Sequence, residues 1–257
     1  MTPKYPDHVT IAHLPTPLEE MPRLSKHLSG PRLFIKRDDQ TGLATGGNKT
    51  RKLEFLVADA LAQKCDYLVT TGAPQSNHCR QTAAAAAKFG LGCSLVLSGE
   101  QPVHVSGNLL LDQLLGAHLY WTGPRTRQEV MTAVAAELRT MGHKPYVIPL
   151  GGSNVMGATG YVRAMGELVG QLQAQRINVD FIVFASSSGG TQAGIVLGAA
   201  IYGFRGPIIG ISVDHPAPEL QTQVAALATA TATHLGLGTM SLAAQIDVND
   251  DYLGDGY

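Results

Sequence analysis

The sequence has few charges and no long apolar run, and each shortage excludes a class of protein. Charged residues make up 15% of the 257 residues, and 19 basic against 20 acidic side chains give a net charge of −1. Such a balance offers no general field for attracting nucleic acid or an anionic membrane. No stretch approaches the roughly 18 apolar residues of a membrane span, and the opening MTPKYPDHVT lacks a signal-peptide core. We therefore expect a soluble cytoplasmic protein without nucleic-acid or membrane partners.

Cysteine and clustered histidine are also scarce. The three cysteines, Cys65, Cys79 and Cys93, are odd in number and contain no CxxC pair. This spacing favours neither a disulfide framework nor a zinc site, so we expect buried or half-buried thiols. The nine histidines show no HExxH or other ligand spacing, and we predict no metal site. A hydrolase triad has no support, because no Gly-x-Ser-x-Gly motif is present.

Short apolar runs alternate with longer segments of helical period from residue 32 onward, which is typical of an α/β fold with parallel sheets. The predicted strands cover residues 33–36, 67–71, 94–97, 118–121, 146–148, 181–185 and 208–212. The predicted helices cover residues 51–63, 78–89, 107–115, 127–141, 158–173, 191–202 and 219–235. Two glycine pairs, Gly46-Gly47 and Gly151-Gly152, bracket about a hundred residues that form a candidate sub-domain.

The strongest local signal is an apolar strand that runs into a loop of serine, glycine and threonine. A helix is predicted to follow the loop residues Ser187, Ser188, Gly189, Gly190 and Thr191. Backbone N–H groups at a helix N-terminus bind phosphate, and glycine lets the ligand approach closely. The loop matches neither a Walker A motif nor GxGxxG. A phosphate site and an ordinary strand-to-helix turn capped by serine both fit this segment.

A second signal is the segment Gly46-Gly-Asn-Lys49-Thr-Arg-Lys52, which leads into a predicted helix. The positive end of the helix dipole disfavours a cation, so the Lys49 amine should lose its proton readily and act as a carbonyl nucleophile. Lys52 follows on nearly the same helix face, in position to meet a phosphate. The alternative is a solvated basic patch of Lys49, Arg51 and Lys52. A Schiff-base lysine beside a phosphate site is what pyridoxal phosphate (PLP) requires.

A third signal follows the predicted strand at residues 67–71. Ser76, Asn77 and His78 come at the start of the next helix, and ligands of open α/β sheets lie outside the carboxyl ends of the strands. Hydroxyl, amide and backbone N–H donors at this position suit a substrate carboxylate. The alternative is a plain serine or asparagine helix cap.

Four longer segments occur in the order GGNKTRKLEFLVADAL, TTGAPQSNHCRQTAAAAAKFGL, PYVIPLGGSN and SSSGGTQAG. In these segments the chain resembles the family of D-cysteine desulfhydrases and 1-aminocyclopropane-1-carboxylate (ACC) deaminases, which are tryptophan-synthase-β-like, fold-type II PLP enzymes. The resemblance extends from HLPTPL and IKRDD to the final DDY and GY. It implies a large PLP-binding domain of residues 1–49 and 158–257, a small inserted α/β domain of residues 50–157, a cofactor in the cleft, and a homodimer.

The resemblance also implies a role for each site residue. Lys49 holds PLP covalently, and Lys52 assists its phosphate. The phosphate loop consists of Ser187, Ser188, Gly189, Gly190 and Thr191. On the substrate side, Asn77 binds the phenolic oxygen of the cofactor, Ser76 to His78 form the carboxylate loop, Ser76 is a base or nucleophile, and Tyr257 is a substrate-side tyrosine.

The activity implied by the resemblance is that of a PLP-dependent lyase for a small amino acid. D-cysteine gives pyruvate, ammonia and hydrogen sulfide by β-elimination, whereas ACC gives 2-oxobutanoate and ammonia. Lys49, or Ser76 on the other face, is the candidate base. Position 78 favours the desulfhydrase branch, because the deaminase branch commonly has glutamine there; Pro74 departs from the isoleucine of both. Two alternatives stay open, a lyase for a related β-substituted amino acid and a small-molecule-binding module. A third follows from the resemblance: family members continue past position 257, so the chain is alternatively a truncated PLP-binding homologue impaired in catalysis.

Overall fold

The computed structural model of the chain describes residues 2–238, 240 and 242–254. The helices are α1 (Pro22–His27), α2 (Lys49–Ala62), α3 (Asn77–Phe89), α4 (Gly107–Leu114), α5 (Arg127–Thr140), α6 (Val155–Gln175), α7 (Gly190–Tyr202) and α8 (Ala217–His234). The strands are β1 (Leu18–Glu20), β2 (Phe34–Lys36), β3 (Tyr67–Gly72), β4 (Gly92–Leu97), β5 (His118–Trp121), β6 (Pro145–Val147), β7 (Ile182–Ser186), β8 (Ile208–Ser212) and β9 (Asp247–Asn249).

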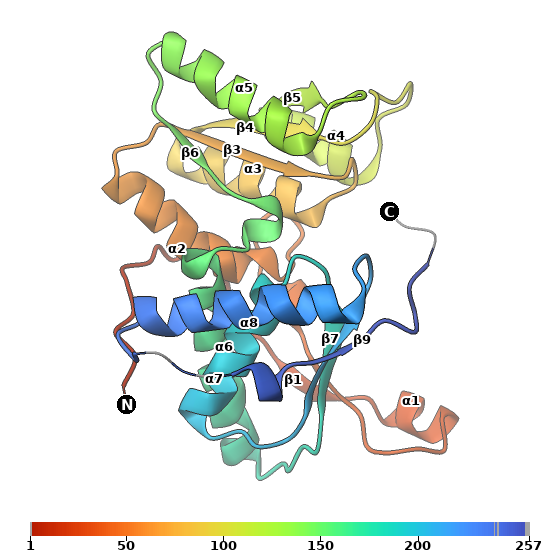
Figure 1. Cartoon of the computed structure of the whole chain (residues 1–257). Helices are drawn as coiled ribbons and strands as arrows, with labels where there is room; N and C mark the ends of the chain where they lie inside the picture. Colours follow the sequence, from red (N-terminus) through yellow and green to blue (C-terminus); the bar gives the residue numbers. More distant parts are fainter. Residues whose placement is uncertain (1, 239, 241, 255–257) are drawn as a thin grey trace.

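The four-stranded sheet has the order β5-β4-β3-β6, and all of its neighbouring strands run parallel, as expected. On one face Leu68 and Leu95 pack in a core with α2 and α3. On the other face Val69 and Val96 pack against α5. Because both faces are covered, the strands read as nearly continuous apolar runs. This sheet and its helices form one end of the molecule (Figure 1).

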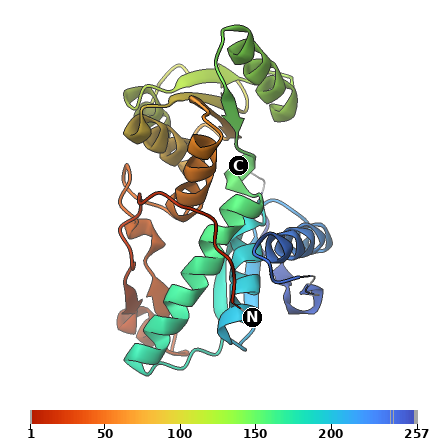
Figure 2. The ribbon, with the colours of Figure 1, turned by 90° about the vertical axis from the view of Figure 1, so that its left-hand side faces the viewer.

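The three-stranded sheet has the order β7-β8-β9, is also parallel, and lies toward the other end of the molecule (Figures 1 and 2). Helices α6, α7 and α8 supply its core, in which Val162, Val196 and Leu220 are fully buried. The edge strand β7 and the residue before it leave apolar side chains on the surface, since Val183 is 58% and Phe181 is 57% exposed. None of the helices in the described part of the chain has the length and hydropathy that a membrane crossing requires.

The first predicted strand, at residues 33–36, does not join a parallel sheet, which corrects the expectation for this segment. Strand β2 pairs antiparallel with β1, and Leu18 lies opposite Lys36. A parallel crossover is usually made by a full α-helix, whereas the connection between these strands contains only the six-residue α1. The two strands and α1 form an arm that extends from the body (Figure 1). The sequence prediction also omitted β1, α1 and β9, which are three to six residues long.

A buried ion-pair network holds the start of α2 against α6. Arg51 is 2% exposed, and its guanidinium donates to Asp38 and Glu167 at 2.8–3.1 Å. Burial alone would raise the pKa of Glu167, but hydrogen bonds from Arg51 and Lys36 lower it to about 2. Lys52 is buried as well, at 1% exposure. The solvated basic patch that the sequence left open is therefore wrong for both Arg51 and Lys52, because tertiary packing covers this face of the helix.

Candidate active site

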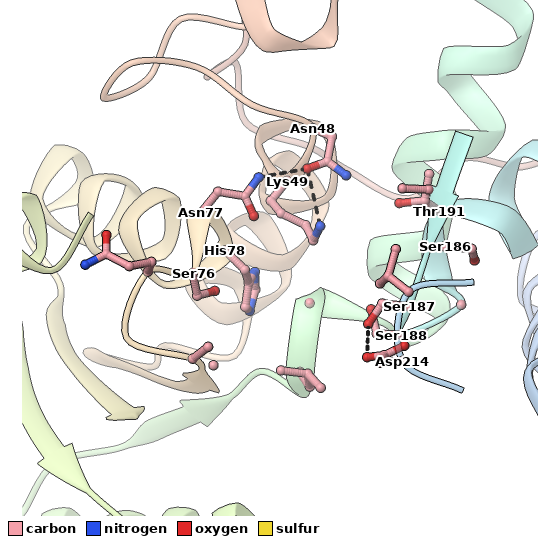
Figure 3. Close-up of a pocket in the computed structure, with 18 of the residues that line it drawn as sticks. Asn48, Lys49, Ser76, Asn77, His78, Ser186, Ser187, Ser188, Thr191 and Asp214 are labelled. Atoms are coloured by element: carbon pink, nitrogen blue, oxygen red, sulfur yellow. Dashed lines mark hydrogen bonds between the residues drawn. The ribbon is translucent and has the colours of Figure 1, made fainter. Parts of the chain in front are cut away.

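A cavity of about 650 Å³ lies at the carboxyl ends of β3 and β7, among the first turns of α2, α3 and α7. Figure 3 shows the side chains of Lys49 and Asn77 on one side of it and those of Ser187 and Ser188 on the other. Most of the site residues expected from the sequence line this cavity, namely Lys49, Ser76, Asn77, His78, Ser187, Ser188, Gly189 and Thr191. Lys52 and Gly190 are not among the lining residues, and Tyr257 lies outside the described residues.

Lys49 is the first residue of α2, and the glycine pair before it shapes the turn into the helix. Gly46 has φ of 76°, and a Cβ there would lie 1.9 Å from the carbonyl oxygen of Asp39, so only glycine fits. The Lys49 Nζ donates to Asn48 Oδ1 at 3.3 Å. Burial lowers the pKa of Lys49 to about 8. The direction is the one expected from the sequence, and the loss of water around the amine is its cause in the folded chain.

Lys52 lies behind the cavity wall, one turn further along α2. Its Nζ donates to the carbonyl oxygen of Gly151 at 3.0 Å and to Ser153 Oγ at 3.4 Å. Burial, and secondly the charge of Lys49, lower the pKa of Lys52 well below its usual value. A Cβ on Gly190 would lie 2.9 Å from Lys52 Nζ. Lys52 therefore sits beneath the first residue of α7, where it supports the loop from behind.

The start of α3 combines a helix cap with free donors. Ser76 Oγ accepts a hydrogen bond from the backbone N–H of Cys79 at 3.2 Å, so the cap expected as the plain alternative is present. Ser76 also lines the cavity, and capping does not use its hydroxyl proton. The backbone N–H groups of Asn77 and His78 lie in the first turn, where a helix has no acceptor of its own. This turn can bind a carboxylate through backbone donors.

The side chain of His78 is not available to bind a carboxylate. Its ring is 2% exposed, and its Nε2 lies 2.8 Å from Thr70 Oγ1. Burial, followed by the charges of Lys49 and Lys52, lowers the pKa of His78 well below its usual value. A neutral ring offers no charge to a carboxylate, so only the backbone N–H of His78 suits the binding role expected from the sequence.

The loop between β7 and α7 presents backbone N–H groups. Gly189 precedes α7 with φ of 74°, and no side chain caps the helix. Within the described residues, the N–H groups of Ser188, Gly189 and Thr191 have no hydrogen-bond acceptor, whereas Gly190 N–H donates to Ser153 Oγ at 3.1 Å. A helix start with free N–H groups is an anion site. The geometry therefore favours the phosphate site over the plain capped turn.

Asn48 belongs to the site although the sequence analysis did not single it out. Its Oδ1 accepts hydrogen bonds from Lys49 Nζ at 3.3 Å and from Asn77 Nδ2 at 3.1 Å (Figure 3). One amide oxygen thus joins the start of α2 to the start of α3. Its position next to Lys49 in the sequence was the available signal.

Two further polar residues were also missed. Ser153 shares a hydrogen bond with Ser188 at 2.7 Å between their Oγ atoms, and Asp214 accepts one from Ser187 Oγ at 2.6 Å (Figure 3). Ser153 belongs to the segment Gly-Gly-Ser-Asn, and Asp214 follows the predicted strand at residues 208–212. The rule that ligands lie beyond the carboxyl ends of strands would have found Asp214.

Comparison with known proteins decides the family. A family model described as pyridoxal-phosphate dependent enzyme matches residues 9–257. The chain belongs to this family of PLP-dependent enzymes. It is 43% identical to a D-cysteine desulfhydrase of Klebsiella pneumoniae over 95% of the chain and 74% of that protein. It is 42% identical to a putative ACC deaminase of Pyrococcus abyssi over 89% of the chain and 69% of that protein.

A solved structure agrees with the sequence relatives. The chain superimposes on an ACC deaminase homologue with a TM-score of 0.87 and 37% identity, covering 99% of this chain and 76% of that one. The fold-type II α/β architecture expected from the resemblance is therefore confirmed, and so is the dependence on PLP.

The residues of the cavity fit this cofactor. The start of α7 offers unpaired N–H groups for a phosphate, and Lys49, with a pKa lowered to about 8, offers an amine for an aldehyde. Glycine lets the two flanking loops approach closely. A Cβ on Gly151 would lie 2.3 Å from Ser188 Oγ, and one on Gly190 would lie 2.5 Å from Ser153 Oγ. The anion site and the reactive amine consequently border one cavity.

Proposed function

We propose that the chain is a PLP-dependent lyase that converts D-cysteine and water to pyruvate, ammonia and hydrogen sulfide by β-elimination. The observation that carries the proposal is the single cavity bordered by a lysine of lowered pKa, a carboxylate-binding helix start and an anion-binding loop. The choice of D-cysteine is supported by the name of the Klebsiella relative and by the histidine at position 78, which follows the desulfhydrase pattern.

In this proposal the two walls of the cavity divide the work of holding the cofactor. The N–H groups of the loop at residues 187–191 bind the phosphate, and Lys52 supports them from behind. Lys49 would hold the aldehyde carbon covalently, with loss of one water, and Asn77 would donate to the phenolic oxygen through the amide N–H that Asn48 leaves free. When bound, the cofactor supplies a carbonyl group for the substrate amine and an electron sink for the electron pair left at Cα.

The remaining steps belong to the chain. The backbone N–H groups of Asn77 and His78 bind the substrate carboxylate and orient Cα. The Lys49 amine, once released by the substrate, removes the Cα proton, because its pKa of about 8 leaves a neutral fraction at physiological pH. Ser76 approaches from the wall of α3 and is the second candidate for this proton. The Cβ–S bond then breaks, and sulfur leaves with the electron pair and a proton as hydrogen sulfide.

A second activity is favoured by a specific observation. The Pyrococcus relative and the superimposed structure carry ACC deaminase names. The same groups would then open the ring of ACC and release 2-oxobutanoate and ammonia with the uptake of one water. Substrate choice between the two is a question of product analysis.

We also propose the organisation that the resemblance implies. Residues 1–49 and 158–257 form a large PLP-binding domain, and residues 50–157 form a small one, which is supported by two separate sheets with separate cores. The proposed assembly is a homodimer, and the proposed compartment is the cytoplasm. The cysteines Cys65, Cys79 and Cys93 are buried and free, which suits a reducing compartment.

The test is to load the purified chain with PLP and to measure its visible absorption band and its products. We expect a band that disappears in Lys49→Ala and persists in Lys88→Ala, which replaces an exposed lysine of α3. Hydrogen sulfide and pyruvate from D-cysteine support the lyase, and 2-oxobutanoate from ACC supports the alternative. A band without either product supports the impaired homologue, whereas a wild-type protein without a band contradicts the proposal.

A further inference from the structure

His78 makes a contact that fixes where its proton lies. The ring Nε2 lies 2.8 Å from Thr70 Oγ1, and the same hydroxyl donates to the carbonyl oxygen of Ile148 at 2.9 Å. A threonine hydroxyl has a single proton, and a carbonyl oxygen can only accept. The Thr70 proton is therefore used on Ile148, and His78 Nε2 must be the donor of the shorter bond.

The neutral ring consequently carries a lone pair on Nδ1. This atom is buried and has no hydrogen-bond partner within the described part of the chain. A buried acceptor without a donor is less stable than a paired one. His78 nevertheless lies in the wall of the cavity, where a donor can reach it.

The Lys49 amine is the donor best placed to do so. A Cβ on Gly151 would lie 3.5 Å from Lys49 Cε, and a Cβ on the next residue, Gly152, would lie 3.6 Å from His78 Cε1 and equally far from Lys52 Cδ. The two side chains thus flank one glycine turn. Lys49 Nζ has a single long hydrogen bond, to Asn48, whereas Lys52 Nζ already has two oxygen partners.

A neutral acceptor suits an amine that must lose and regain a proton. A carboxylate beside Lys49 would hold the proton and raise the pKa of the amine, whereas a neutral imidazole attracts the ammonium form far less. Among the described residues no carboxylate contributes to the lowered pKa of Lys49, and burial is its cause.

We propose that His78 is a positioning residue for Lys49, whose amine exchanges between two neutral acceptors, Asn48 Oδ1 and the Nδ1 of the imidazole that Thr70 anchors. This inference rests on the proposed function only in taking Lys49 as the reacting amine. Its tests use the cofactor-free protein, so they stand apart from the failure or success of any activity assay.

The first test measures the pKa of Lys49 from the pH dependence of its labelling by an amine-directed reagent, read by mass spectrometry of the Lys49 peptide. His78→Met removes the acceptor, which destabilises the ammonium form and lowers this pKa by about one unit. His78→Gln offers an amide N–H for Thr70 and an oxygen near the place of Nδ1, so it restores the wild-type value. Thr70→Val frees the ring and lowers the pKa by less than His78→Met does.

The second test reads the ring directly, and it remains informative if His78→Met does not fold. In ¹⁵N NMR of histidine-labelled, cofactor-free protein we expect His78 to show a protonated Nε2 and an unprotonated Nδ1. Lys49→Met shifts the Nδ1 resonance, and the control Lys88→Met leaves it in place. A protonated Nδ1 overturns the proposal. The proposal also fails if Lys49→Met leaves the Nδ1 resonance unchanged, or if both His78→Met and Thr70→Val leave the pKa of Lys49 unchanged.

Discussion

The first turns of α2 and α7 border the same cavity and are opposite in character. Helix α2 begins with Lys49 and carries Arg51 and Lys52 in its first turn, although the helix dipole disfavours cations there. Helix α7 begins with Gly190 and Thr191 and carries no charge in its first turn. The backbone N–H groups at the start of α7 can therefore bind an anion, whereas the start of α2 carries three basic side chains.

The difference shows how the start of one helix can supply a reactive amine while the start of another supplies only N–H groups that bind an anion. Each cation of α2 has a different environment. Arg51 is neutralised by the carboxylates of Asp38 and Glu167, and Lys52 is bonded to uncharged oxygens of the turn at residues 151–153. Lys49 has only the amide oxygen of Asn48. Of these two amines and one guanidinium group, the Lys49 amine has the fewest hydrogen bonds, and it is the group that faces the cavity.

Replacing the paired cation has the largest expected effect on stability. Arg51→Met removes the guanidinium that pairs with the half-buried carboxylate of Asp38 and leaves Glu167 with Lys36 alone, and we expect a loss of about 3–5 kcal/mol in the free energy of unfolding. Urea unfolding followed by circular dichroism measures it. The control Arg37→Met removes a half-buried arginine that also has two carboxylate partners, at a side-chain exposure of 27% against 2% for Arg51, and should change stability less. Equal losses of stability in the two variants would show that the Arg51 ion pairs stabilise the fold no more than those of Arg37.

A methyl group at the start of α7 tests the anion-binding half of the comparison. In Gly190→Ala the added Cβ would lie 2.5 Å from Ser153 Oγ, so the loop must shift and we expect at least tenfold weaker binding of PLP and about 1–3 kcal/mol of destabilisation. Equilibrium titration of the cofactor and thermal unfolding measure the two effects.

The matched control for this change is Gly170→Ala, because a Cβ at that position of α6 meets nothing within 4 Å. It should leave binding unchanged and stabilise the helix by up to about 1 kcal/mol. Unchanged cofactor binding in Gly190→Ala would contradict the close fit assigned to the loop.

Lys52→Met separates two effects of the buried Lys52 amine, namely its effect on the stability of the fold and its effect on the binding of PLP. The pKa of Lys52 is lowered by burial, which means that its charged form is destabilised in the folded, cofactor-free protein. Removing it should therefore raise the stability of that form at pH 7, while binding of PLP weakens by about 10–100-fold because the amine that supports the phosphate loop from behind is lost. Lys88→Met, on the surface of α3, should change neither quantity. Tighter or unchanged binding would remove Lys52 from the phosphate site.

The last prediction changes neither the sequence nor the stability of the fold and concerns the pH dependence of cofactor loading at Lys49. Only the neutral amine attacks an aldehyde, and the pKa of Lys49 is lowered from its usual 10.5 to about 8. The rate of appearance of the visible band should rise about tenfold per pH unit below this value and level off above it. Stopped-flow mixing of cofactor-free protein with PLP measures the profile. A rise that continues to pH 10 would show an ordinary, solvated amine.

Much of the secondary structure could be predicted, because strands and helices have different apolar periods. The bounds predicted for β5 and β8 coincide with those observed, and β6 is offset by one residue. The arm was predicted only in part: the strand at residues 33–36 was expected, whereas β1 was missed because three exposed or half-buried residues have no apolar pattern to detect. Its antiparallel pairing depends on a contact between segments, which periodicity does not report.

The sequence by itself determined the α/β class, the family resemblance and the clustering of the segments around Lys49, Ser76 and Ser187. Local patterns carry this information, and the carboxyl ends of parallel strands meet at one edge of a sheet. Only the tertiary structure decided which charges are buried and which are paired. Lys49, Arg51 and Lys52 are close together in the sequence, yet one faces a cavity, one is held by two carboxylates and one lies under α7. Burial and pairing depend on residues distant in the chain, such as Glu167 and Gly190, and these contacts exist only after folding.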